Sequence, residues 1–304
     1  MFISIYRLFS NLIGPFVRGY LLYRLIKGKE DTKRYRERLG LTQKNRPTGK
    51  LLWFHAASIG ESLSLLSLID HLNKEYPEFR LLVTTGTVSS AKLLEKRLPK
   101  YAFHQYVPID RVIYVKRFLK YWRPSLAIWS ESEFWPNLII ETARENIPLL
   151  LIQGRLSEKA YKKWKMFPWA IKNILTRFKI CLAQTKNDAE RLNRLGAPVA
   201  RYLGNLKVAS LPLPYNGKDL EVLKNKILNR RVWLAASTHN YEEEIIWSTH
   251  LKVAEKIPDL LTIIVPRHPV RSQAIAAKLS VQGANVVIRS SHGNIKSETQ
   301  IYLA

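Results

Sequence analysis

The chain has 304 residues and a mass of 35.3 kDa, about twice the length of a typical domain, so we expect two domains. Hydrophobic residues make up 46% of the chain and charged residues 24%, which excludes collagen-like, low-complexity and wholly disordered proteins. The 49 lysines and arginines against 24 aspartates and glutamates give a net charge of +25, which favours an anionic partner: nucleic acid, an anionic membrane face or a phosphorylated substrate.

The first segment, residues 1–27, is predicted to form an amphipathic helix that anchors the chain to a membrane surface. Its longest uncharged run, residues 8–17, is too short to span a bilayer, whose apolar core needs about twenty residues. Arg7, Asn11 and Arg18 lie on a polar stripe, which is typical of a helix that lies in the interface. A soluble-domain helix with one buried face and a membrane-spanning helix remain alternatives.

A basic segment follows this helix directly. Cations beside a membrane are attracted to an anionic cytoplasmic leaflet by about 1 kcal/mol per residue. No cleavage site with small residues is present, so we do not expect a removable signal peptide. The basic residues are Lys27, Lys29, Lys33, Arg34, Arg36 and Arg38.

Residues 28–207 are predicted to form a Rossmann-like domain. Short apolar runs alternate there with amphipathic segments, a pattern typical of a parallel sheet with helices on both faces. The single cysteine, Cys181, has no partner for an internal disulfide, which favours a reducing compartment. The predicted strands are Leu51–His55, Arg80–Thr85, Ala102–Val107, Ser125–Ser130, Leu149–Gln153, Ile180–Gln184 and Val199–Leu203, and the predicted helices include Leu63–Glu75, Ser89–Leu98, Val112–Tyr121 and Leu138–Asn146.

A linker is predicted at residues 208–218, which contain two prolines and a glycine. A second Rossmann-like domain is predicted at residues 219–304. Because open parallel sheets place ligand-binding loops after their strands, a domain that stops on a strand is expected to be incomplete. Its predicted elements are helix Leu220–Leu228, strand Arg231–Ala236, helix Glu242–Lys256, strand Leu261–Pro266, helix Pro269–Val281, strand Asn285–Arg289 and strand Gln300–Ala304.

The segment from His55 to Ser62 leads from a predicted strand into a helix. Its small residues allow the backbone to approach a ligand closely, and Glu61 falls at a helix N-terminus. A carboxylate there can accept a proton from an incoming hydroxyl. The alternative is a capping box, in which Glu61 and Ser58 only close the first helical turn.

The segment from Ile128 to Asn137 combines two acids, two tryptophans and a proline after another predicted strand. Glu131 and Glu133 are candidates for acid–base work or for accepting sugar hydroxyls, and tryptophan is a common carbohydrate platform. Metal binding is the weaker interpretation, because the chain has no Asp-x-Asp motif and no Cys/His cluster with the spacing of zinc ligands. Helix-start acids beside packed aromatic rings are the structural alternative.

The segment Arg155–Lys179 holds eight basic residues and one acid, with aromatic residues between them. Such a surface suits either nucleic acid, with bases stacked on the rings, or a membrane interface. The amphipathic N-terminal segment favours the lipid interpretation over nucleic acid. A solvated helix face remains an alternative.

Two strand-to-helix junctions of the second domain are suited to anions. Ser237 and Thr238 can bind phosphate through their hydroxyls at a helix N-terminus, or they can simply cap that helix. Arg267 and His268 are held between prolines at the end of another predicted strand, where arginine can grip a phosphate with two hydrogen bonds.

Taken together, these motifs resemble the bacterial 3-deoxy-D-manno-octulosonic acid (Kdo) transferases. The resemblance implies a two-domain GT-B glycosyltransferase that needs no metal or other cofactor and transfers Kdo from CMP-Kdo to a lipid A precursor. It also implies a place on the cytoplasmic face of the bacterial inner membrane. The motifs are Arg36–Gly40, His55–Glu61, Glu131–Asn137, Gly204–Lys207, Ser237–His239 and Pro266–Pro269.

The resemblance also implies roles for single residues. Glu61 would be the general base that deprotonates the acceptor hydroxyl, and Glu131 and Lys207 would support the transition state, with inversion at the sugar carbon. The CMP phosphate would be held by four residues of the second domain. These are Arg267 and His268, with help from Ser237 and Thr238.

The chain departs from the family pattern in two places. Asn240 stands where relatives usually have glycine, and relatives continue beyond Ala304 into a nucleotide-binding loop and a closing helix. We therefore expect part of the donor site to be missing. The alternatives are a truncated, inactive transferase remnant that still binds membranes, or a basic nucleic-acid-binding protein.

Overall fold

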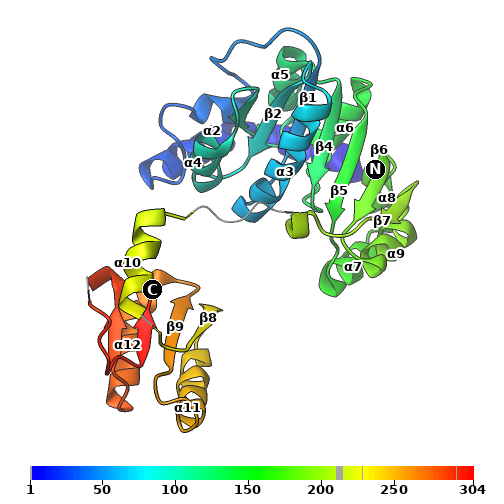
Figure 1. Cartoon of the computed structure of the whole chain (residues 1–304). Coiled ribbons are helices and arrows are strands. Elements are labelled where there is room, and N and C mark those ends of the chain that lie inside the picture. Colours follow the sequence, from blue (N-terminus) through cyan, green and yellow to red (C-terminus); the bar gives the residue numbers. More distant parts are fainter. Residues whose placement is uncertain (1, 210–214, 228, 292) are drawn as a thin grey trace. The chain divides into compact units, whose positions relative to one another are not determined.

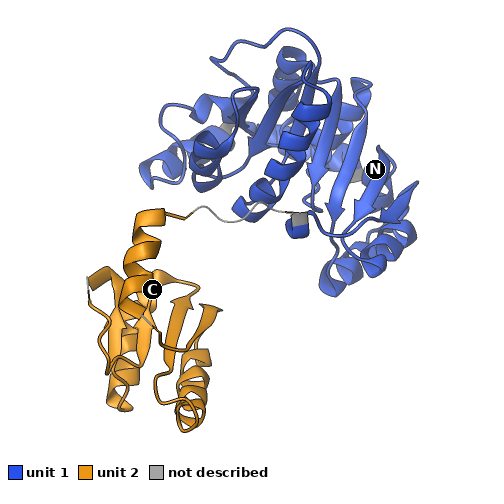
Figure 2. Ribbon diagram, in the orientation of Figure 1, with its two compact units in different colours: residues 1–212 blue, residues 213–304 orange. Residues whose placement is uncertain are grey.

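The computed structural model describes every residue except 1, 210–214, 228 and 292 (Figure 1). The chain divides into two compact units, Met1–Pro212 and Leu213–Ala304, coloured separately in Figure 2. The centre of the expected linker, residues 210–214, lies outside the described residues.

Unit 1 contains a seven-stranded parallel sheet in the order β3-β2-β1-β4-β5-β6-β7 (Figure 1). All seven strands were predicted, because apolar runs buried on both faces of a sheet are visible in the sequence. Strand β6 begins two residues earlier than expected, since Phe178 pairs with Leu149 and its ring is buried in the core. The strands are β1 (Leu51–His55), β2 (Arg80–Thr85), β3 (Ala102–Tyr106), β4 (Leu126–Ser130), β5 (Leu149–Gly154), β6 (Phe178–Ala183) and β7 (Ala200–Tyr202).

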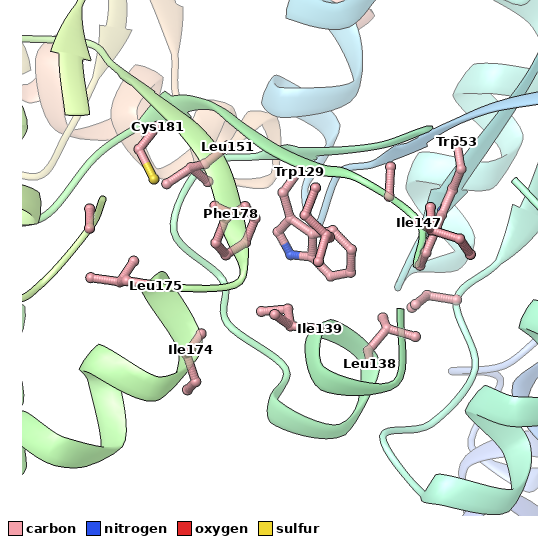
Figure 3. Close-up of a cluster of buried hydrophobic side chains, with 14 of the residues drawn as sticks. Trp53, Trp129, Leu138, Ile139, Ile147, Leu151, Ile174, Leu175, Phe178 and Cys181 are labelled. Atoms are coloured by element: carbon pink, nitrogen blue, oxygen red, sulfur yellow. The ribbon is translucent and has the colours of Figure 1, made fainter. Parts of the chain in front are cut away.

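Both faces of this sheet are covered by helices. Successive side chains of a strand alternate between two apolar clusters, so Trp53 belongs to one cluster and Phe54 to the other. Figure 3 shows the cluster of Trp53, in which Trp129 and Phe178 of the sheet lie near Leu138 of α6. The helices and 3-10 turns after the N-terminal segment are η1 (Tyr35–Leu39), α3 (Ile59–Glu75), α4 (Val88–Arg97), α5 (Val112–Trp122), α6 (Pro136–Arg144), α7 (Glu158–Lys165), α8 (Pro168–Leu175), α9 (Lys186–Arg194) and η2 (Leu206–Ala209).

The N-terminal segment differs from the single helix expected over residues 1–27. It forms two helices, α1 (Phe2–Leu12) and α2 (Gly14–Ile26), separated at Ile13. The break coincides with Gly14-Pro15, because proline has no amide hydrogen to continue the helical hydrogen-bond ladder. No helix within the described residues is both long and apolar enough to cross a membrane.

One side of α1, which carries Tyr6, Arg7 and Ser10, faces the body of unit 1, whereas Asn11 and Arg18 of the expected polar stripe are exposed. The Tyr6 hydroxyl donates to Asp110 at 2.9 Å, and the Arg7 guanidinium lies 2.6 Å from Glu141 on α6. The Asn137 side-chain amide donates to the Ser10 hydroxyl at 3.1 Å. The apolar side of α1 and α2 is therefore turned outward. Its exposed side chains are Ile5, Leu8, Phe9, Leu12, Phe16, Tyr20, Leu22, Tyr23 and Ile26.

Unit 2 contains a four-stranded parallel sheet in the order β10-β11-β9-β8. Trp247, Ile264 and Leu303 belong to its main apolar cluster. The single helix expected over Pro269–Val281 is a short 3-10 turn followed by an α-helix. The elements are α10 (Gly217–Ile227), β8 (Val232–Thr238), α11 (Glu242–Ala254), β9 (Leu261–Pro266), η3 (Pro269–Arg271), α12 (Ser272–Val281), β10 (Val286–Ile288), η4 (Arg289–Ser291) and β11 (Ile301–Leu303).

Candidate functional site

The candidate site of unit 1 lies where its strand order reverses. Strands β1 to β3 run outward to one edge of the sheet, and the chain then returns to place β4 on the other side of β1. His55 and Trp129 are register partners, so the loops after β1 and β4 leave the sheet side by side. Open α/β sheets bind ligands at this reversal, beyond the carboxyl ends of the strands. Glu61 follows β1 and Glu131 follows β4.

Glu61 lies in the first turn of α3, where it forms a reciprocal capping box. Its carboxylate accepts from the Ala57 amide at 2.7 Å and from the Ser58 hydroxyl at 2.8 Å. The Ser58 oxygen in turn accepts from the Glu61 amide at 3.3 Å. The capping box of Glu61 and Ser58, the structural alternative to catalysis, is therefore present in the molecule. The capping contacts are compatible with a catalytic role, because they fix the carboxylate at the switch point and no ion pair to it occurs among the residues that the structure describes.

The surroundings of Glu61 make its carboxyl a stronger base than an exposed glutamate. The residue is only 7% exposed, and burial raises its pKa. The hydrogen bonds from Ala57 and Ser58 oppose this rise in pKa, while the negative charges of Glu131 and Glu133 add to it. A carboxylate with a raised pKa holds an abstracted proton better at neutral pH.

Glu131 and Lys207 are brought together from distant parts of unit 1. Glu131 has a φ of +58°, a left-handed conformation that is uncommon for residues with a side chain. Its amide donates to the Ile152 carbonyl at 3.0 Å, and its carboxylate lies 3.2 Å from the Lys207 ammonium. Asn205 orients the η2 turn by accepting from the Lys207 amide at 2.9 Å.

The two tryptophans beside Glu133 have different surroundings. Trp129 is fully buried in the core and donates to the Glu133 carbonyl at 3.0 Å, so the expectation of a carbohydrate platform is wrong for this ring. Trp135 is 39% exposed and donates to the Glu133 carboxylate at 3.3 Å. Of the two rings, only Trp135 is accessible to a ligand.

Sequence reasoning missed Gln153, at the end of β5. Its side chain is 4% exposed, its φ is +56°, and its amide donates to the Gly204 carbonyl at 3.4 Å. Its side-chain oxygen is buried without a hydrogen-bond partner among the described residues, as is Nε2 of His55. The only sequence signal was the position of Gln153 at a strand end, which places it beside the loop that carries Lys207.

In unit 2, the predicted phosphate-binding residues follow the neighbouring strands β8 and β9. Ser237 has a φ of +61°, and the strand register shifts there. The Arg267 amide donates to the Thr238 carbonyl at 3.0 Å, which joins the two loops. Ser237, Arg267 and His268 are exposed.

The other polar groups of these loops are used within unit 2. The Thr238 hydroxyl is buried and donates to Glu243 at 2.8 Å. The remaining Glu243 oxygen pairs with Arg271 at 3.0 Å. Ser237 therefore offers the accessible hydroxyl, while Thr238 fixes the start of α11. Across the described residues of both units, no three His, Cys, Asp or Glu side chains gather as metal ligands.

Comparison with protein families identifies relatives over most of the chain. The family model of 3-deoxy-D-manno-octulosonic-acid transferase (kdotransferase) matches residues 33–210. A 3-deoxy-D-manno-octulosonic acid transferase from Rickettsia bellii is 38% identical over 95% of this chain and 69% of its own length. One from Rickettsia felis is 40% identical over 83% of this chain, which corresponds to 54% of the relative's length.

Solved structures show the same fold at low sequence identity. UDP-GlcNAc 2-epimerase from Neisseria meningitidis, bound to UDP-GlcNAc, matches 84% of this chain and 72% of its own chain with a TM-score of 0.56. The sequence identity is 15%, so the likeness concerns the fold alone. The expectation of an α/β chain with two parallel sheets of the GT-B kind is confirmed to that extent.

Proposed function

The chain belongs to the family of Kdo transferases, and from that premise we propose that it transfers Kdo from CMP-Kdo to a lipid A precursor. The observation that carries the proposal is the placement of Glu61 and Glu131 on neighbouring loops at the switch point of unit 1, with Lys207 at 3.2 Å from Glu131. Among the described residues, Glu61 has no ion-pair partner and has a raised pKa, while Glu131 forms an ion pair with Lys207. Two neighbouring carboxyl groups in such different environments can take different parts in acid–base chemistry, one as the base and the other as a fixed negative charge.

In the proposed reaction, a hydroxyl oxygen of the acceptor attacks the anomeric carbon of Kdo. Glu61 takes the hydroxyl proton as the new carbon–oxygen bond forms. The bond between that carbon and the phosphate oxygen breaks, and its electron pair leaves with CMP. Attack from the face opposite the leaving group inverts the configuration, and Lys207 and Glu131 orient the reacting groups.

The developing charge on the CMP phosphate needs donors, which we assign to unit 2. The Arg267 guanidinium can donate to two phosphate oxygens at once. His268, which also follows β9, and Ser237, at the end of the neighbouring strand β8, are exposed. Thr238 has a supporting role, because its hydroxyl holds Glu243 and so fixes the loop. No cofactor other than the donor substrate enters this scheme.

The acceptor is lipid-linked in this proposal, and the outer surface of unit 1 is suited to a membrane. The apolar sides of α1 and α2 are exposed, and cations flank them in the following basic segment. A second exposed surface carries Met166, Phe167 and Trp169 beside the lysines of α7. We therefore place the protein on the cytoplasmic face of the bacterial inner membrane.

Transfer of radiolabelled Kdo to a tetraacyl lipid A precursor in detergent micelles tests the proposal, with CMP-Kdo generated in the same reaction. The Rickettsia bellii relative provides the positive control. A chimera in which the unaligned C-terminal part of that relative follows Ala304 is assayed beside the 304-residue chain, so that chain length is tested separately.

We expect transfer by the chimera and a product of the same mobility as that of the Rickettsia bellii relative. Activity confined to the chimera would support the family chemistry and show that residues 1–304 alone are not sufficient for transfer. Failure of both proteins, together with oligonucleotide binding that weakens steeply with salt, would contradict the proposal and favour the nucleic-acid alternative.

A further inference from the structure

A pocket of about 230 Å³ lies beside the η1 turn, away from the switch point. Four of its lining side chains are cationic, and one is acidic. The proposed transferase chemistry uses none of them. The charged lining residues are Lys33, Arg34, Arg36, Lys44 and Glu37.

Two of these cations converge on one backbone oxygen. The His104 carbonyl accepts from the Lys44 ammonium at 2.7 Å and from the Arg34 guanidinium at 2.9 Å. The His104 ring adds no positive charge of its own, because burial and the nearby cations lower its pKa to about 2 and keep the ring neutral. Two like charges thus meet at a carbonyl dipole, an arrangement that an anion would stabilise.

The carboxylates around the pocket are already paired. Both oxygens of Glu37 accept from Arg34 at 3.0 Å, and one also accepts from the Tyr106 amide at 2.7 Å. Glu95 pairs with the same guanidinium at 2.5 Å. Asp31 accepts from the backbone amides of Lys33 and Arg34 at 2.9 and 3.1 Å. The carboxylates near the pocket are therefore bound to Arg34 and to backbone amides rather than to the other cations of the lining.

Three cations remain without a carboxylate partner among the described residues: Lys33, Arg36 and Lys44. Burial, followed by the charge of Arg34, lowers the pKa of the half-buried Lys44 ammonium, and the charges of Glu37 and Glu95 oppose this only in part. Lys33 and Arg36 are exposed at the rim.

We propose that this pocket binds a phosphate monoester, with Lys44 at its floor and Lys33 and Arg36 at its rim. A phosphate monoester carries between one and two negative charges at neutral pH and offers three strong acceptor oxygens, which suit two ammonium groups and one guanidinium fork. The ester belongs either to a lipid headgroup or to a water-soluble compound. The proposal is independent of the Kdo transferase reaction.

Isothermal titration of the 304-residue chain with sn-glycerol 3-phosphate tests the pocket, together with sedimentation of the chain with phosphatidic acid vesicles. The variants are Lys44→Gln and Arg36→Gln. The matched control is Lys252→Gln, which removes one exposed cation of α11 in unit 2, outside the pocket and outside the basic segment. Thermal unfolding of each variant verifies that it is folded.

We expect one saturable site per chain, at least tenfold weaker in Lys44→Gln and Arg36→Gln and unchanged in Lys252→Gln. Loss of vesicle binding alone in the pocket variants would identify a lipid headgroup, and loss of glycerol phosphate binding alone would identify a soluble ester. Equal weakening in all three variants would overturn the proposal, because it would reveal general attraction by the net charge. Absence of saturable binding of either probe would overturn it as well.

Discussion

At the scale of single residues, Glu61 has a structural role as a helix cap, and we propose a chemical role for the same carboxylate. The contacts that close the first turn of α3 also hold the carboxylate at the switch point, 2.7 Å from the Ala57 amide. Its burial and the two nearby acids raise its pKa, and Lys207 pairs with Glu131 rather than with Glu61. The capping box explains the position of Glu61, and the raised pKa supports the role of base that the family resemblance implies for this residue.

Another residue-scale property is the acid sensitivity of the fold. The His104 ring is 2% exposed, and burial together with the cations Arg34, Lys44 and Arg38 lowers its pKa to about 2. Unfolded histidine titrates near pH 6.5, so the unfolded chain binds more protons below that pH. We expect the free energy of unfolding to fall on acidification by up to about 1.4 kcal/mol per pH unit from this group.

Denaturant unfolding at pH 7 and pH 5 measures the effect. His104→Gln should lose less stability between the two pH values than the native chain, because its amide does not titrate. His55 and Asp110 are present in both proteins and cancel in the comparison. Exposed His71→Gln is the control. An equal pH dependence in the native chain and in His104→Gln would contradict this explanation.

At the scale of helices and strands, the sequence predicted the order of elements well. The bounds of β1, β2 and β9 were predicted to the residue. Strands buried on both faces of a parallel sheet consist mostly of apolar and β-branched residues, and such runs are visible in the sequence. The Glu61 and Glu131 loops were identified for the same reason, since each follows such a run. The left-handed conformations at Glu131 and Gln153 were not predictable, because neither residue type indicates a positive φ.

The N-terminal helices show what the sequence lacked. Helical periodicity separated a polar from an apolar side of α1, but the direction of each side depends on partners far away in the chain. Asp110, Asn137 and Glu141 bind the polar side of α1 and leave the apolar side exposed. The break at Ile13 was missed because periodicity was given more weight than the Gly14-Pro15 pair.

An element-scale prediction concerns Gly40, which ends the η1 turn with a φ of +73°. A Cβ atom there would lie 2.1 Å from the Tyr114 carbonyl oxygen, so backbone must move. We expect Gly40→Ala to lower the free energy of unfolding by about 2 kcal/mol or more.

Urea unfolding compares this variant with Gly19→Ala in the interior of α2. A Cβ atom on Gly19 meets nothing within 4 Å, so alanine there should raise stability by about 0.5–1 kcal/mol through helix propensity. Equal stabilities of the two variants would contradict the close approach of η1 to α5.

At the scale of the whole molecule, the net charge of +25 and the exposed apolar side chains of α1 and α2 both suit an anionic membrane surface. Cations attract an anionic surface over distance, and apolar side chains then insert into it. Leu8 and Leu12 are 62% and 66% exposed, and their contact with water is unfavourable in free energy. We propose that contact with a membrane removes these side chains from water.

Sedimentation with phosphatidylglycerol vesicles tests this surface. Leu8→Ser with Leu12→Ser should lower the vesicle partition coefficient at least tenfold, because each leucine contributes about 1.5 kcal/mol or more when it is buried. The control is Ile245→Ser on α11, which is 65% exposed and lies in unit 2. If the control lowers partitioning as much as the double variant, the outer face of α1 is not the membrane-binding surface.

We propose that Glu61 is the base of Kdo transfer, and one comparison of transfer rates tests this role most directly. Kdo transfer to the lipid A precursor is measured for the chimera described above, with and without Glu61→Gln. Glutamine keeps an oxygen for the Ala57 amide but cannot take up a proton. Glu75→Gln, at the exposed end of the same helix, is the control.

We expect a transfer rate at least 100-fold lower in Glu61→Gln, with unchanged thermal unfolding and an unaffected rate in Glu75→Gln. A Glu61→Gln protein that retains the rate within a few-fold would contradict it. Glu61 would then be a helix cap, and the base would have to be sought elsewhere at the switch point.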